Sequence, residues 1–227
     1  GRVMFPIRYR RGRVIGFGCR VLGDGTPKYL NSPETPIFHK GLEVYGLYEA
    51  RQANRDLNRV FVVEGYMDVI ALAQFGITNA VATLGTAIGT AHIRKLLKYT
   101  DEIAFCFDGD AAGTRAAWKA LELSLPAMHD GISLRFMFLP DGQDPDDFVR
   151  ANGAEQFNQL AARADTIGDY LFKELTQQIH LDSLENKAKF AKRASELIDK
   201  IPAGIFHNLM QARLAEFVGT DVPTPAS

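Results

Sequence analysis

The chain has 227 residues, 46% of them hydrophobic, and a formal net charge of -1 at pH 7. This length is enough to bury the core of one large or two small domains, and no apolar run is long enough to span a bilayer. Only two cysteines occur, without metal-ligand spacing, so we expect a cytoplasmic protein with no membrane partner, no disulfide framework and no zinc site in this chain.

The first 40 residues are strongly basic although the whole chain is nearly neutral. Residues 1–40 include eight basic and two acidic residues, whereas residues 60–150 include seven basic and twelve acidic ones. Alternating apolar and polar residues around "RRGR" predict a β-hairpin over Val3–Leu22, and Gly and Pro predict a loop after it. We interpret residues 1–41 as one basic segment, which either faces a polyanion or is simply a solvated hairpin.

The next hundred residues alternate buried strands with helices. After a helical pattern over Leu42–Asn54, the expected strands are Arg59–Val63, Asn79–Thr83, Ile103–Phe107 and Ser133–Phe138, and the expected helices lie near Asp68–Gln74, Thr90–Tyr99 and Ala111–Leu123. This rhythm predicts an α/β core over residues 42–150, with a parallel sheet and helices on both faces. Residues 151–219 are expected to form a helical subdomain, whose clearest helical pattern starts at Ala154, and residues 220–227 a linker-like tail.

Acidic residues follow three of the four expected strands, in the motifs "VVEGYMD", "FDGDAAG" and "DGQDPDD". They are Glu64, Asp68, Asp108, Asp110, Asp141, Asp144, Asp146 and Asp147. The carboxyl ends of parallel strands meet at one edge of a sheet, and carboxylates crowded there repel one another unless a cation neutralises them. The pattern favours a site for Mg²⁺ or Mn²⁺. The alternative is that these residues only begin helices and form surface turns.

Several other catalytic patterns are missing from the sequence. There is no GxxxxGK[ST], no GxGxxG after a strand, no GxSxG and no HExxH, and "GTAIGTAH" has neither phosphate-loop spacing. Each of the five histidines is therefore expected to be a surface or core residue.

The motifs carry a resemblance to a known family. Glu-Gly after one strand and Asp-x-Asp after a later one resemble the Toprim domain of topoisomerases, some nucleases and bacterial primases. The longer stretches "VVEGYMDVIAL", "FDGDAAG" and "DGQDPDDFV", with "KYLNSPETPIFHKG" upstream, resemble the DnaG-type replicative primases over nearly the whole chain. The resemblance implies a Toprim-type fold and DNA-templated synthesis of RNA primers from ribonucleoside triphosphates, at the bacterial replication fork.

The resemblance also implies which parts of the family lie outside this chain. These are a zinc-binding domain, the first part of the polymerase region, and a C-terminal domain that binds the replicative helicase. Zinc and the helicase are therefore expected to bind the parent protein elsewhere.

Roles for individual residues follow from the same resemblance. Glu64, Asp108 and Asp110 would be the main metal ligands, although Glu64 could instead be the general base. Asp68 would support these ligands or bind metal itself, and Asp144 and Asp146 would hold a further ion. The residues implied to face single-stranded template and nucleotide, and alarmones such as ppGpp, are Arg20, Lys28, Tyr29, Asn31 and Lys40.

Three functions remain open from the residues. They are primer synthesis, phosphodiester cleavage by a metal-dependent nuclease or topoisomerase, and nucleic-acid binding without chemistry. No tyrosine stands in a pattern that marks a topoisomerase nucleophile, whereas "DGQDPDD" and "KYLNSPET" favour primer synthesis.

Overall fold

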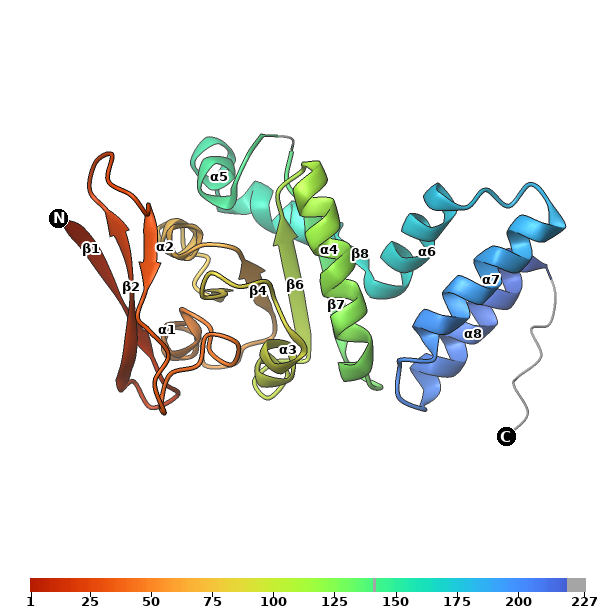
Figure 1. The fold of residues 1–227 in the computed structure, drawn as a ribbon, viewed down its shortest axis with the longest axis horizontal. Coiled ribbons are helices and arrows are strands. Elements are labelled where there is room, and N and C mark those ends of the chain that lie inside the picture. Colours follow the sequence, from red (N-terminus) through yellow and green to blue (C-terminus); the bar gives the residue numbers. More distant parts are fainter. Residues whose placement is uncertain (141, 220–227) are drawn as a thin grey trace.

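The computed structural model describes residues 1–140 and 142–219. Asp141 of the acidic motif and the tail at 220–227 lie outside the described residues. Figure 1 shows a small β-sheet near the N-terminus, a central sheet flanked by helices, and a helical region at the other end. No helix of the described part is long and apolar enough to cross a membrane.

The N-terminal sheet has three antiparallel strands, β1 (Arg2–Arg8), β2 (Val14–Val21) and β3 (Tyr29–Asn31). The predicted hairpin is confirmed by the pairing of β1 with β2. The prediction of a loop after it is wrong at β3, whose Leu30 pairs with Cys19 of β2. Three residues are too few to produce a recognisable period-two pattern, so the flanking Gly and Pro dominated the prediction.

The central sheet has five strands in the order β5-β4-β6-β7-β8. The strands are β4 (Val60–Val63), β5 (Ala80–Ala82), β6 (Glu102–Phe107), β7 (Ser133–Phe138) and β8 (Asp165–Thr166). The predicted parallel sheet is confirmed for the first four. The two-residue β8 corrects the prediction, because it runs antiparallel to β7 within a region expected to be helical.

Helices cover both faces of this sheet, as predicted. One face packs against α2 (Tyr66–Gln74) and α5 (Pro145–Ala162). The other face packs against α3 (Thr90–Leu96), α4 (Ala111–Ser124), the short 3₁₀ helix η1 (Leu125–Ala127) and α6 (Ile167–Gln178). The last two helices, α7 (Leu184–Ile198) and α8 (Ile205–Val218), complete the core on this second face. Neighbouring strand residues alternate between the faces: Phe61 and Cys106 meet α2 and α5, while Val62 and Phe105 meet the other layer.

Two helix boundaries differ from the predictions. The pattern over Leu42–Asn54 forms a helix only as α1 (Leu47–Ala53), because Gly46 has a φ of 86° and Tyr45 pairs with Ala82 at the edge of the sheet. Helix α5 begins nine residues before the expected Ala154, directly after its N-cap Asp144.

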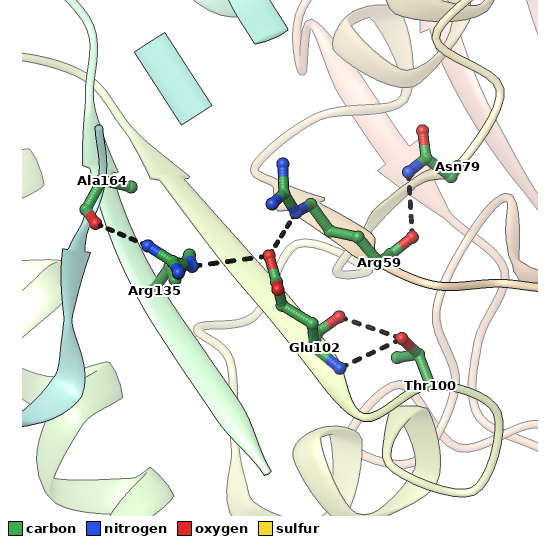
Figure 2. A network of polar contacts seen from close by, with 6 residues as sticks. All are labelled: Arg59, Asn79, Thr100, Glu102, Arg135 and Ala164. Carbon is green, nitrogen blue, oxygen red and sulfur yellow. Dashed lines mark hydrogen bonds and ion pairs between the residues drawn. The ribbon is translucent and has the colours of Figure 1, made fainter. Parts of the chain in front are cut away.

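A polar network joins the amino ends of β4 and β6 to β7 and to the start of β8 (Figure 2). The Glu102 carboxylate forms an ion pair with Arg59, just before β4, and lies 3.5 Å from Nε of Arg135 in β7. Nη1 of Arg135 donates to the Ala164 carbonyl at 3.2 Å, just before β8. The network therefore links the amino ends of β4 and β6 with the third residue of β7 and the residue before the antiparallel β8.

The N-terminal sheet packs closely on the central domain at Gly18. A Cβ atom at this position would lie 2.5 Å from the Tyr66 ring of α2, so Gly18→Ala must displace the ring or the strand. We expect Gly18→Ala to lower the free energy of unfolding by about 1–3 kcal/mol, measured by urea denaturation. The matched control is Gly41→Ala, because a Cβ there meets no heavy atom within 4 Å. Equal stability of the two variants would contradict this packing.

Candidate metal and nucleotide site

The acidic residues gather where the central strands end and the following helices begin. Glu64 directly follows β4 and Asp108 directly follows β6; Figure 1 shows the arrowhead of β6 pointing toward the edge where α4 and α5 start. Asp110 is the N-cap of α4, accepting from the Gly113 amide at 2.7 Å, and Asp144 is the N-cap of α5. Asp110 and Asp144 therefore have a structural role as helix caps, but each cap uses only the Oδ1 atom.

Asp68 is the most buried of the acidic residues and is 9% exposed. Its Oδ2 accepts from the Gly65 amide at 2.9 Å in the first turn of α2. Burial raises the pKa of Asp68 to about 7, against the opposing effect of this hydrogen bond, and the charges of Asp144, Asp108 and Asp146 raise it further. Carboxylates that follow three different strands thus act on one another electrostatically.

Glu64 and Asp108 belong to the same electrostatic cluster. Burial raises the pKa of Glu64, and the charges of Asp108 and Asp110 add to this rise. Burial likewise raises the pKa of Asp108, with Asp144 and Asp110 adding to it. Each carboxylate therefore makes ionisation of the next one less favourable, and a bound cation would relieve that cost.

The carboxylates share an edge without surrounding a common point. Within residues 1–140 and 142–219, no three acidic, histidine or cysteine side chains form a group able to hold a metal ion. Asp146 is also ion-paired with Arg150, one turn further along α5. The donor set nevertheless fits a hard divalent cation, because it consists of carboxylate oxygens that repel one another. Side-chain movements would be needed to complete the coordination.

Three of the predicted nucleotide-facing residues lie together on the N-terminal sheet. The Arg20 guanidinium lies 5.8 Å and the Lys28 ammonium 5.9 Å from the centre of the Tyr29 ring, which is itself partly exposed. Arg20 and Lys28 line a groove of about 710 Å³, which Met67 and Ile70 of α2 also line. We call this the Arg20 groove.

Asn31 has a connecting position rather than a free side chain. Its Nδ2 donates to the Leu84 carbonyl at 3.0 Å, and its Oδ1 accepts from the Tyr66 hydroxyl, two residues after Glu64. Asn31 thus ties the N-terminal sheet to the first residue of α2 and to the loop that follows β5.

Lys40 does not line the Arg20 groove. Its carbonyl accepts from Nε2 of the buried His92, at 2.9 Å, and its amide donates to Glu34. Lys40 therefore lies against α3, apart from the other predicted basic residues. His92 is a core residue, as expected.

Sequence reasoning missed a cavity of about 330 Å³ beside Glu64. It is lined by Thr83, Gly85 and Thr86 after β5 and by Lys119 of α4, over the sheet residues Phe105 and Phe107. The sequence "GTAIGTAH" contributes to this lining, but it lacks phosphate-loop spacing and therefore predicts no site. Its position after a parallel strand was the signal that could have found it.

Comparison with known proteins shows close relatives. The chain is 57% identical over 219 residues to a DNA primase of Pseudomonas aeruginosa, covering 96% of this chain and 33% of the relative. It is similar to the solved Escherichia coli primase catalytic core, with a TM-score of 0.94 and 51% identity over all of this chain and 72% of that one. A DnaG primase catalytic domain bound to single-stranded DNA matches with a TM-score of 0.90 and 53% identity, covering 95% of this chain and 69% of that one.

The four parallel strands and their acidic edge define a Toprim-type domain, and a Toprim-like family model matches residues 61–149. A model of the N-terminal domain of the DNA primase catalytic core matches residues 1–51. The chain belongs to the bacterial DnaG-type DNA primase family, and it spans about a third of the length of the curated relatives it matches.

A third family model, the DnaB-helicase binding domain of primase, matches residues 169–222. This match corrects the expectation that the helicase-binding region lies outside this chain. The described part of this segment consists of most of α6 followed by α7 and α8. Their apolar stripe of Phe190, Ala194, Leu197, Ile198 and Ile201 is buried and serves packing, as predicted.

Proposed function

We propose that this chain supplies the metal-binding part of an enzyme that synthesises RNA primers on a single-stranded DNA template. The observation that supports this most directly is the edge of mutually repelling carboxylates in a Toprim-type domain next to a basic sheet. In such a reaction a primer 3′-hydroxyl attacks the α-phosphate of a ribonucleoside triphosphate, and pyrophosphate leaves. A bound divalent metal supplies charge stabilisation for the attacking and leaving oxygens.

The carboxylates divide into two groups in this proposal. Glu64, Asp108 and Asp110 hold Mg²⁺, or Mn²⁺ in its place, and the uncapped Oδ2 of Asp110 is its available donor. Asp144 and Asp146 hold a further ion, for which Asp146 must release Arg150.

Asp68 and Glu64 have proton-dependent roles. Asp68, with a pKa of about 7, keeps the Gly65 turn in place and its charge responds to bound cations. Glu64 has a raised pKa and is the alternative acceptor for the proton of the attacking hydroxyl.

The N-terminal sheet provides contacts for phosphates and bases. Arg20 and Lys28 bind phosphate oxygens, and Tyr29 stacks on a base. Asn31 holds this surface against the start of α2, two residues after Glu64. Lys40 contributes from its separate position near α3. Alarmone nucleotides such as ppGpp have the same phosphate-rich chemistry and would occupy the same surface.

The remaining partners belong to the parent protein. We assign contact with the replicative helicase to residues 169–222 together with regions outside this chain, and zinc to a domain outside it. The setting that fits these partners is the cytoplasmic replication fork of a bacterium.

The assay that separates the candidate functions uses the full-length parent protein. It is incubated with a single-stranded DNA template, labelled ribonucleotides and Mg²⁺, and the products are resolved by size. Template-dependent RNA is the expected product. Nicked template would indicate the cleaving function instead, and binding without either product would indicate a module without chemistry.

Loss of a basic side chain in the Arg20 groove should change the salt dependence of binding. For Arg20→Gln or Lys28→Gln, we expect the logarithmic slope of affinity for single-stranded DNA against salt to fall by about 0.7, the value for one phosphate contact. Fluorescence anisotropy at several salt concentrations measures this slope. Lys189→Gln, on the exposed side of α7, is the matched control. Unchanged slopes in both groove variants would show that Arg20 and Lys28 do not contact phosphates, and that the basic sheet is only a solvated surface.

A further inference from the structure

A second basic surface lies at the amino edge of the central sheet, away from the acidic residues. It begins with the turn between β1 and β2, which is held against α1. Arg51 of α1 donates through Nη1 to the Arg10 carbonyl at 3.2 Å, and Arg8 pairs with Glu49 at 3.2 Å. Gly12 lies against the Tyr48 ring, where a Cβ atom would approach to 2.8 Å. The "RRGR" turn is therefore a fixed part of the surface.

A concavity of about 550 Å³ lies beside this turn. It is formed by the end of α1 and by the loops that lead into β4 and β6. The concavity therefore lies at the amino ends of these two strands. Its basic lining residues are Arg51, Arg55 and Lys98, and its acidic ones are Asp56 and Asp101.

The cations of this region outnumber its anions. In the described part of the chain no ion pair involves Arg10, Arg11, Arg13, Arg51, Arg55 or Lys98. Two of these cations lie over aromatic rings, of which Tyr9 is exposed and Tyr99 is partly buried against the core. The Arg10 guanidinium lies 5.5 Å from the centre of the Tyr9 ring, and that of Arg51 lies 4.5 Å from the Tyr99 ring. We call these six cations and two tyrosines the far basic surface.

We propose that the far basic surface binds single-stranded nucleic acid. Basic side chains that bind a phosphate backbone, interleaved with aromatic rings that stack on bases, are the recognition chemistry of single strands. An acidic protein segment would use the charges but not the rings. This proposal rests on the proposed function in one respect: the nucleic-acid strand bound here is the same strand that contacts the Arg20 groove.

The geometry of β2 sets the length of strand required. Arg13 stands just before β2 and Arg20 near its other end, seven residues away, which corresponds to about 23 Å at 3.3 Å per residue. A single strand is more extended than the duplex rise of about 3.4 Å per nucleotide, so fewer than about seven nucleotides span this distance. A 20-mer therefore reaches both surfaces, whereas a trinucleotide reaches a single surface.

The test compares labelled oligothymidylates of 3 and 20 nucleotides by fluorescence anisotropy. The variant is Arg11→Gln/Arg55→Gln/Lys98→Gln, and the control is Lys187→Gln/Lys189→Gln/Lys192→Gln on α7, which removes the same charge. We expect the variant to bind the 20-mer about tenfold more weakly than the control, with a salt slope lower by about 2, from three contacts of about 0.7 each. We expect a smaller loss with the 3-mer, and melting temperatures confirm that both proteins fold.

Two results would overturn the proposal. One is equal binding of the 20-mer by variant and control. The other is displacement of the 20-mer by polyglutamate of the same charge as efficiently as by unlabelled oligothymidylate, which would assign the surface to an acidic protein partner. Failure of the proposed function is distinguishable, because Mg²⁺ binding at the acidic edge responds to Asp108→Asn and not to this triple variant.

Discussion

Asp108→Asn should reduce RNA synthesis by the full-length parent by at least about a thousandfold while leaving the fold at least as stable. The loss follows from removing a proposed metal ligand in a reaction that depends on electrostatic stabilisation. Burial and the charges of Asp144 and Asp110 raise the pKa of Asp108. The ionised Asp108 side chain therefore destabilises the folded state, and its replacement by a neutral amide should not lower the stability. Ribonucleotide incorporation measures the first effect and urea denaturation the second.

Glu155→Gln is the control for this change. Glu155 is exposed on α5 and accepts a hydrogen bond from Gln159, which a glutamine oxygen can also accept. This variant should keep both activity and stability. Normal RNA synthesis by Asp108→Asn would show that the reaction does not need Asp108 as a metal ligand.

Asp68 should make the metal-free protein less stable as the pH rises from about 4 to 7. The unfolded chain releases this proton near 3.8, whereas the folded protein keeps it until about pH 7. Between these values the folded state binds more protons, so rising pH favours unfolding. Ionisation of Asp68 lowers the free energy of unfolding by at most about 4 kcal/mol, and this loss is complete above pH 7.

Asp68→Asn isolates this contribution. An asparagine oxygen can still accept from the Gly65 amide, and the buried charge is lost. We expect the variant to melt about 5–10 °C higher than the unsubstituted protein at pH 8 and equally at pH 4. Thermal unfolding in chelator across this range measures the difference. An equal pH dependence in both proteins would show that Asp68 does not carry the buried charge.

The predictable part of the fold came from local patterns. The apolar runs of β4 and β6 are buried on both faces, so their sequences are continuous and easily recognised. Because parallel strands share one edge, the positions of Glu64 and Asp108 after these strands predicted that their carboxylates would act on one another.

The parts that could not be predicted depend on contacts between distant residues. Strand β3 exists through its pairing with β2. Asn31 reaches both Tyr66 and Leu84, a connection that no spacing in the sequence reveals. The shortening of α1 depends on the pairing of Tyr45 with Ala82, 37 positions later. Tertiary contacts override local helical periodicity at such places.

Isothermal titration of Mg²⁺, and separately of Mn²⁺, into residues 1–227 tests the central claim most directly. We predict saturable binding that is lost or weakened at least about tenfold in Asp108→Asn and Glu64→Gln, because each removes a charged oxygen ligand. Glu155→Gln should bind as the unsubstituted chain does. Identical isotherms for all four proteins would contradict the account, because the carboxylates at the strand ends would then not form the metal site.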